Sequence, residues 1–311
     1  MAKYKYRFSI FTATYNRSGN LKKLYNDILK QDFDGLYEWI IVSDGSTDDT
    51  EDVVNTFESN SHLTIRFVSQ AHGGKHKAWR TATNLFEGRY VLTADDDDPI
   101  PPTALSVFDK YWKELEKDPD YNQFWEVKSR AQYENGTLVG PELPIPYYDS
   151  NYIDITFKQK KGAEMDGCRK VEVLRNEAAV PDFFYYDEKC TNYPEGVRWT
   201  AAARKYKTRF VPDITRTYVI GHESLCTSTS KSRSSQRNYN SLVSSLYTIK
   251  GNGDLLLRYM PFKYFKLQLQ LAYSAIRVNE HVYSLLDRIV DKMAYCMVHI
   301  PAYLLYQIRN Y

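Results

Sequence analysis

The first hundred residues alternate between apolar runs of strand length and longer stretches with apolar residues at helical spacing. The strand-like runs lie at residues 7–14, 38–42, 63–68 and 89–94. The helix-like stretches lie between them, at residues 18–31, 46–60 and 74–86. Repeated strand–helix units predict an α/β fold, with a mostly parallel central sheet and flanking helices.

The pattern becomes mixed after Pro102 and helical towards the C-terminus. Two apolar runs around Glu134-Asn135-Gly136 indicate a β-hairpin, and residues 196–206 look helical. The Ser/Thr-rich segment 224–238 predicts a mobile connection. From residue 239 the chain reads as a helical extension rich in aromatic and basic residues.

Four consecutive carboxylates, Asp95 to Asp98, directly follow the last strand-like run. Like charges repel one another, so a bare acidic cluster at a strand end destabilises the fold. A hard divalent cation such as Mg²⁺ takes oxygen ligands and would remove that repulsion. In an extended chain alternate residues share a face, so Asp95 and Asp97 would point one way and Asp96 and Asp98 the other. A solvated acidic loop is the alternative interpretation.

Other polar groups also follow predicted strands, where ligands bind in parallel sheets. Thr14 and Tyr15 end the first strand, and Asp44 ends the second. The Asp44 carboxylate could accept hydrogen bonds from a nucleotide base, or it could simply form a turn or cap the next helix. Lys75 follows two glycines at a predicted helix start, a position that favours a bound diphosphate, although a solvated lysine is the alternative.

The formal net charge of +2 conceals an asymmetry between two parts of the chain. Residues 231–311 carry 11 Lys and Arg against 4 Asp and Glu, a net charge of +7, and residues 1–230 carry the remaining −5. Because the first part is acidic, we do not expect a nucleic-acid partner. Four scattered cysteines indicate a reducing compartment, and no signal peptide is apparent, so a cytoplasmic location is expected.

The C-terminal stretch, residues 239–311, interleaves Leu, Tyr and Phe with Lys and Arg. Its apolar run at 293–306 is broken by His299 and Pro301 and is shorter than the roughly 20 residues of a membrane span. Basic aromatic helices of this kind lie in the interface of anionic membranes. We therefore predict peripheral membrane contact through these helices. A helical cap on the first domain or a homodimer interface is the alternative.

Four motifs follow one another along the first hundred residues. They are Thr12-Ala13-Thr14-Tyr15-Asn16, Ser43-Asp44-Gly45-Ser46, His72-Gly73-Gly74-Lys75 and Ala94-Asp95-Asp96-Asp97-Asp98. In order and spacing they resemble the family 2 glycosyltransferases of GT-A fold. The resemblance spans residues 8–102, continues more weakly to residue 218 and does not define the C-terminal helices. The family usually has Pro in place of Ala13, and Arg and Asn in place of Trp79 and Arg80.

The resemblance implies a GT-A catalytic domain and a role for each motif. A GT-A catalytic domain would span residues 1–223, with a nucleotide-binding half at about 1–102 and an acceptor half at about 103–223. The mobile segment 224–238 and the helical extension 239–311 would follow it. The implied donor-binding residues are Thr14, Tyr15, Asp44, Lys75, Asp95 and Asp96.

Two further roles concern metal and proton transfer. Asp97 would bind Mn²⁺ or Mg²⁺, although the motif could instead fall one residue later, on Asp96 and Asp98. His222 could be a second metal ligand or an ordinary packing residue. Glu195 would be the catalytic base, with Asp187 and Glu188 as rivals, or only an acid that complements a helix dipole.

The function implied by the resemblance is metal-dependent, inverting transfer of a sugar from a nucleotide-sugar donor, with UDP expected. The acceptor would be a hydroxyl group of a glycan or lipid-linked oligosaccharide, as in capsule or O-antigen synthesis at the inner face of the plasma membrane. A nucleotidyltransferase and a non-catalytic subunit that binds sugar nucleotides are the rival hypotheses.

Overall fold

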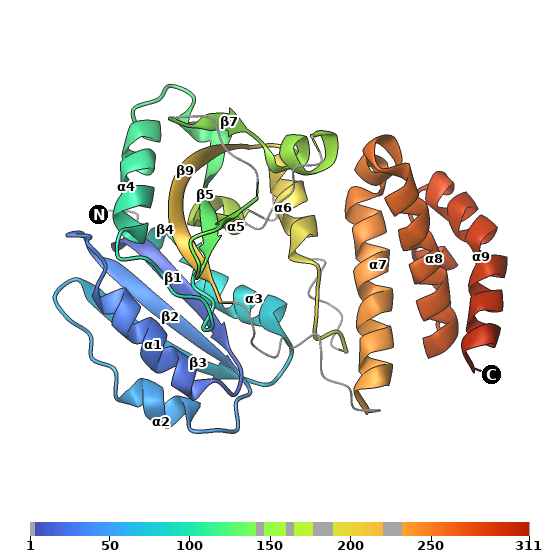
Figure 1. Cartoon of the computed structure of the whole chain (residues 1–311), viewed down its shortest axis with the longest axis horizontal. Coiled ribbons are helices and arrows are strands. Elements are labelled where there is room, and N and C mark those ends of the chain that lie inside the picture. The colour runs from blue at the N-terminus through green and yellow to red at the C-terminus, as the bar shows by residue number, and fades with distance from the viewer. Residues whose placement is uncertain (1–3, 141–145, 160–164, 177–188, 220–231, 311) are drawn as a thin grey trace. The chain divides into compact units, whose positions relative to one another are not determined.

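The computed structural model describes residues 4–140, 146–159, 165–176, 189–219 and 232–310. The contacts divide the chain into two compact units (Figure 1). The first unit comprises Met1–Asp182 with Ala202–His222, and the second comprises Phe183–Ala201 with Glu223–Tyr311. The second unit therefore includes residues 183–201, which precede the limit predicted from the sequence.

The first unit contains a mixed sheet that begins with four parallel strands. Strands β1 (Tyr6–Thr14), β2 (Tyr37–Asp44), β3 (Leu63–Gln70) and β4 (Gly88–Thr93) lie in the order β3-β2-β1-β4. This half confirms the predicted α/β fold. The carboxyl ends of β1, β2 and β4 therefore meet at one edge of the sheet.

The sheet continues beyond β4 with strands of both directions. Strand β8 (Asp166–Lys170) is antiparallel to β4 and to β5 (Phe124–Tyr133). Strand β9 (Lys207–Tyr218) is parallel to β5, while β7 (Tyr148–Ser150) is antiparallel to β9. The short β6 (Leu138–Val139) pairs with β5 as the predicted hairpin. Strand β9 is 12 residues long, and its last residues run along β5 towards the acidic tract.

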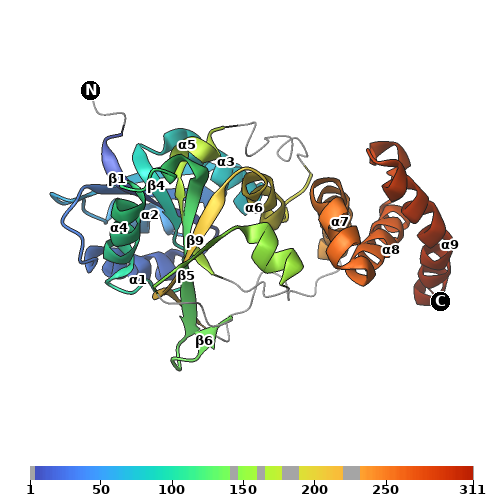
Figure 2. The ribbon, with the colours of Figure 1, turned by 90° about the horizontal axis from the view of Figure 1, so that it is seen from above.

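Helices cover both faces of the parallel strands (Figure 2). Helices α1 (Ser18–Leu29) and α4 (Ala104–Leu115) pack on the face that presents Phe8, Trp39 and Tyr90. Helix α3 (Lys75–Leu85) lies on the other face, where Trp79 contacts Phe11 with ring centroids 4.5 Å apart. The short α5 (Val171–Leu174) follows β8.

One predicted helix is shorter than expected. Helix α2 spans only Thr50–Asn55, whereas the sequence predicted 46–60. The preceding residues instead form a loop, in which the backbone N–H of Thr47 donates to Asn16 Oδ1 at 2.7 Å. The Asp48 side chain accepts from Ser18 and Thr50 in the same loop. Polar side chains thus hold this stretch against the end of β1 and compete with helical hydrogen bonds.

The second unit is helical. Helix α6 (Glu195–Ala203) begins in it, and α7 (Ser232–Tyr259), α8 (Pro261–Val278) and α9 (Ile289–Asn310) lie side by side (Figures 1 and 2). Their core includes Val197, Leu246, Leu271 and Tyr295. Residues 232–238 of the predicted mobile segment are the first turns of α7, and 224–231 lie outside the described residues. Among the described helices, none has the length and apolar character needed to span a bilayer.

Candidate active site

The four aspartates form a turn at the carboxyl end of β4. The backbone N–H of Ala94 still donates to Phe11 of β1 at 2.8 Å, and the N–H of Asp98 then donates to the Asp95 carbonyl at 3.3 Å. The tract is therefore a turn and not the extended chain that the sequence analysis assumed. The Asp95 and Asp97 side chains are partly exposed, whereas Asp96 and Asp98 are buried.

Three cationic side chains from distant parts of the sequence neutralise this turn. Arg17 Nη1 contacts Asp96 Oδ1 at 2.9 Å and Asp97 Oδ2 at 2.6 Å. Lys75 Nζ lies 2.6 Å from Asp95 Oδ1. Arg216, from β9, reaches Asp95 Oδ2 at 2.5 Å, and its Nε donates to Asp98 Oδ2 at 2.8 Å. The like-charge repulsion expected from the sequence is thus balanced within the protein itself.

The turn also bonds to neutral groups of the surrounding strands. Thr14 Oγ1, at the end of β1, donates to Asp96 Oδ2 at 2.6 Å. The N–H of Thr217 in β9 donates to the Pro99 carbonyl at 3.0 Å, just beyond the tract. Strands β1 and β9 therefore hold the turn from two sides.

The surroundings change the acidity of these carboxyl groups in opposite directions. Burial would raise the pKa of Asp95, but Lys75 and Arg216 outweigh it and hold that pKa below its ordinary value. Burial raises the pKa of Asp96 and of Asp98, although Arg17 and Arg216 act against it. Negative charge is consequently more secure on Asp95 than on Asp96 or Asp98.

Asp44 fixes the glycine loop in front of α3. Its Oδ1 accepts from the N–H of Gly73 at 3.0 Å and its Oδ2 from the N–H of Gly74 at 2.7 Å. Gln70 Nε2 also donates to Oδ1 at 2.7 Å, and His72 Nδ1 lies 3.0 Å from Oδ2. Gly74 has a φ of 98°, a conformation that favours glycine. The carboxylate therefore organises the loop that leads into Lys75.

An aromatic surface borders this loop. The ring of Tyr15 stacks on His72 with centroids 4.3 Å apart and planes 27° apart. The next residue, Asn16, has a φ of 53°, the left-handed conformation that Asn tolerates better than most residues. This turn brings Tyr15 from the end of β1 towards His72. The stacked pair therefore lies beside Asp44, which His72 contacts.

The acidic turn suits a divalent cation that takes some of its ligands from the protein and the others from a substrate. Asp97 has the most exposed side chain of the four, at 30%. Its Oδ2 is held by Arg17, and its Oδ1 accepts no hydrogen bond from the described residues. Within those same residues, no three His, Cys, Asp or Glu side chains are grouped to hold a metal by themselves. This arrangement fits Mg²⁺ or Mn²⁺, which need only one or two carboxylates when phosphates supply further oxygens.

The remaining predicted residues are less fully described. Glu195 is the first residue of α6 and is partly exposed. His222, Asp187 and Glu188 lie outside the described residues. Asp166, in β8, is buried and accepts from Thr215 Oγ1 at 2.9 Å.

Arg17 and Arg216 were missed in the sequence analysis. Arg17 directly follows the Thr14-Tyr15-Asn16 motif, so the need for counter-charges near four carboxylates could have identified it. Arg216 has no such signal, since only the pairing of β9 with β5 brings it to the turn.

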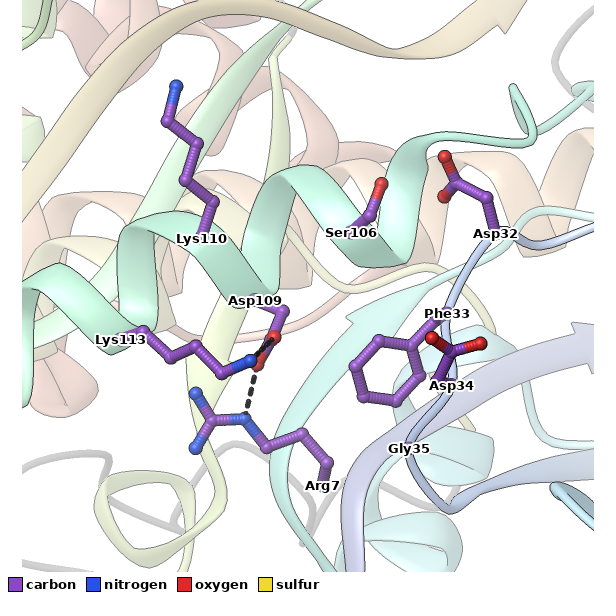
Figure 3. A pocket seen from close by; sticks show the side chains of 9 residues that line it. All are labelled: Arg7, Asp32, Phe33, Asp34, Gly35, Ser106, Asp109, Lys110 and Lys113. Carbon is purple, nitrogen blue, oxygen red and sulfur yellow. Dashed lines mark hydrogen bonds and ion pairs between the residues drawn. The ribbon is translucent and has the colours of Figure 1, made fainter.

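A different pocket, of about 640 Å³, lies at the opposite end of β1 (Figure 3). Arg7, near the start of β1, and Lys113 both contact Asp109 of α4 there, at 2.7 and 2.6 Å. The Arg7–Asp109 contact holds α4 to β1, and Lys113 pairs with Asp109 within α4. Because ligands bind at the carboxyl ends of parallel strands, we assign the active site to the acidic turn and not to this pocket.

Comparison with known proteins finds a family match over residues 9–154. Residues 9–154 match the family model described as Glycosyl transferase family 2. The poly(ribitol-phosphate) β-N-acetylglucosaminyltransferase TarS of Staphylococcus aureus is 34% identical over 100 residues, which are 32% of this chain and 18% of that protein. A chondroitin synthase of Escherichia coli is 35% identical over 108 residues, 34% of this chain and 16% of that protein. The chain thus matches less than a fifth of the length of each relative.

Solved structures support the fold over most of the chain. The S. aureus TarS 1–349 structure in complex with UDP-GlcNAc has a TM-score of 0.53 and 16% identity, covering 94% of this chain and 79% of that one. The mannosyltransferase PcManGT of Pyrobaculum calidifontis, in complex with GDP-Man and Mn²⁺, has a TM-score of 0.54 and 15% identity. That match covers 99% of this chain and 85% of that one.

Proposed function

Because residues 9–154 of this chain belong to glycosyl transferase family 2, we propose that the protein transfers a sugar from a nucleotide-sugar donor to a hydroxyl group of an acceptor glycan. The observation that carries the proposal is the meeting of the acidic turn, the Asp44-held glycine loop and the Tyr15–His72 stack at one edge of the sheet. The TarS complexes with UDP and UDP-GlcNAc favour a UDP-sugar as donor.

The donor would lie along the carboxyl ends of β1, β2 and β4. Its base would stack beside Tyr15 and bond near Asp44, and Asp95 and Asp96 would lie on the ribose side. Its diphosphate would face the start of α3, where backbone N–H groups favour an anion. Lys75 is half-exposed, so its ammonium group can turn from Asp95 to the phosphates.

The proposed metal residues are Asp97 and, outside the described residues, His222. A bound Mn²⁺ or Mg²⁺ would stabilise the negative charge that develops on the leaving diphosphate. Asp97 Oδ1 could take that role directly, but the Arg17 guanidinium on Oδ2 would repel the cation and compete with it. The Asp97 side chain is 30% exposed, so the cation can reach it.

Glu195 is our candidate for the catalytic base. As the acceptor oxygen attacks the anomeric carbon, its proton would pass to the Glu195 carboxylate and the bond to the diphosphate would break. Attack from the face opposite the diphosphate inverts the anomeric carbon. Asp187 and Glu188 are alternative bases close in sequence.

The same proposal covers the acceptor of the sugar and the location of the enzyme. The relatives named for teichoic acid and chondroitin chemistry favour a glycan or lipid-linked acceptor in bacterial surface polysaccharide synthesis. We propose that residues 1–223 perform the transfer. The basic helices from residue 239 onward would hold the enzyme on the inner face of the plasma membrane.

A thermal-shift screen of nucleoside diphosphates with and without Mn²⁺ tests the proposal directly. UDP should raise the melting temperature most, and Mn²⁺ should increase that rise. Incubation with UDP-sugars and an acceptor should then release UDP. Release of pyrophosphate from a nucleoside triphosphate would instead identify a nucleotidyltransferase, and donor binding without hydrolysis or transfer would identify a non-catalytic subunit.

A further inference from the structure

Helix α9 exposes a continuous apolar stripe along its length. The stripe consists of residues three or four apart whose side chains are 56–77% exposed: Ile289, Met293, Met297, Ile300, Leu304 and Ile308. At 100° per residue they fall within a sector of about 100° on one side of the helix. The opposite side, with Ala294, Tyr295 and Ala302, is buried in the core of the second unit. The stripe is therefore not the face that holds α9 to its neighbours.

The stripe is larger than the scattered apolar residues of an ordinary surface. It extends over 20 residues, the first and last of which are about 28 Å apart at the rise of an α-helix. The charged residues within this stretch, Asp291 and Lys292, lie off the stripe by helical spacing. Contiguous exposed apolar surfaces of this size mark sites that contact a partner or a membrane.

The neighbouring helix α8 supplies positive charge to the same unit. Near its start Phe262 is 93% exposed, and Lys263 and Lys266, which follow it, are also exposed. Arg277 lies near its end, and α8 contains no Asp or Glu. An exposed phenylalanine close to lysines is costly in water and favourable in a bilayer interface.

The acidic residue of α9 is already neutralised. Asp291 is buried and contacts Arg288 at 2.6 Å, and Tyr264 Oη donates to it at 2.6 Å. This contact also ties the start of α9 to the start of α8. The two helices therefore present apolar and basic side chains to their surroundings, without an exposed carboxylate on either helix among the described residues.

We propose that α8 and α9 form a membrane-docking surface on which the α9 stripe enters the headgroup–acyl boundary of an anionic bilayer. Lys263, Lys266 and Arg277 would contact the phosphate headgroups. Helix α9 would lie in the plane of the membrane. A second copy of the chain is a poorer occupant, because the basic residues of two copies would face one another. The docking surface itself does not depend on the proposed function. Only its role, which is to bring the enzyme to a lipid-linked acceptor, rests on that function.

Flotation of the full-length protein with vesicles tests this surface. Vesicles with phosphatidylglycerol should bind at low salt, binding should fall at high salt, and pure phosphatidylcholine vesicles should bind far less. Ile300→Asp and, separately, Met293→Asp should weaken binding tenfold or more, since each places a charge in the stripe. Lys263→Gln and Lys266→Gln should each weaken it about fivefold. Leu36→Asp is the matched control, an exposed apolar residue of the first unit that should leave binding unchanged.

Three results would overturn the proposal. In the first, the wild-type protein does not bind vesicles. In the second, both stripe variants still bind them as the wild type does. In the third, the protein does not bind vesicles but forms a dimer in solution that Ile300→Asp dissociates. The last would assign the stripe to a dimer interface. The UDP thermal shift of each variant is measured in parallel and should match the wild type, because the stripe lies outside the active site. Loss of vesicle binding by a stripe variant with an intact UDP shift would therefore support the docking surface. A wild-type protein that shows the UDP shift but ignores vesicles would contradict the docking surface alone.

Discussion

Replacing Arg17 by Gln tests whether the acidic turn is a cation site that the protein occupies with its own side chain. Arg17 Nη1 bridges Asp96 and Asp97 at 2.9 and 2.6 Å. The Arg17 guanidinium opposes a metal at Asp97, because it occupies Oδ2 and repels a cation bound to the other oxygen. Removing the guanidinium should therefore weaken the metal-free protein and, at the same time, strengthen its binding of Mn²⁺.

The exposure of the two side chains sets the size of the effect. The side chains of Arg17 and Asp97 are 23% and 30% exposed. Their contact is therefore intermediate between a surface ion pair, which is worth about 0–1 kcal/mol, and a buried pair, whose loss costs about 3–5 kcal/mol. A competing contact of about 1–2 kcal/mol corresponds to a Kd for Mn²⁺ that is about 5- to 30-fold lower in Arg17→Gln. Without metal, the free energy of unfolding should fall by about 1–3 kcal/mol, because Asp96 is left under-satisfied. Mn²⁺ at 100 times its Kd restores about 2.7 kcal/mol.

Isothermal titration of Mn²⁺ in the presence of UDP measures the Kd, and urea unfolding measures the stability. Arg66→Gln is the control, because Arg66 is similarly exposed and contacts Glu38 at 3.0 Å. It should leave the Kd unchanged. Asp97→Asn should abolish binding. An unchanged or higher Kd in Arg17→Gln would refute the competition, and normal binding by Asp97→Asn would move the metal to Asp96 and Asp98.

Three further predictions follow from the site. Glu195→Gln should bind UDP-sugar with unchanged affinity in calorimetry and transfer sugar at least 100-fold more slowly, and an active variant would assign the base to another residue. Asp95→Asn should lower the free energy of unfolding by about 1–3 kcal/mol at pH 7. Since the folded pKa of Asp95 is depressed despite its burial, wild-type stabilisation is present above the unfolded pKa of about 3.9 and lost as the pH falls towards the folded value. The difference between the two proteins in urea titrations should therefore shrink below about pH 4, and a constant difference contradicts this reasoning. Asp44→Ala should speed hydrogen exchange at Gly73 and Gly74 by tenfold or more and weaken UDP binding, whereas unchanged exchange would show that the loop holds itself.

Local patterns predicted the elements well where each element buries one regular face. The runs at 7–14 and 63–68 form β1 and β3 with nearly the predicted limits. A short apolar run is typical of a strand in a parallel sheet that is covered by helices. The helix predicted at 46–60 was too long. There, Asn16 and Ser18, which follow β1, form hydrogen bonds with Thr47 and Asp48 and so compete with the helical hydrogen bonds of that stretch. Contacts between residues this far apart in the sequence cannot be predicted from a local pattern.

The sequence alone determined the α/β fold, the family and the position of the acidic tract, since these depend on residues close together in the chain. Only the tertiary structure decided how four adjacent carboxylates coexist. Arg17, Lys75 and Arg216 come from the end of β1, the start of α3 and the end of β9. A counter-charge can lie up to 121 residues away from its carboxylate in the sequence, as Arg216 does from Asp95. Strand pairing and packing bring the two together, and the local pattern of apolar residues does not predict this. The apolar stripe of α9 became visible for the same reason, because only the packed helices show which side remains uncovered.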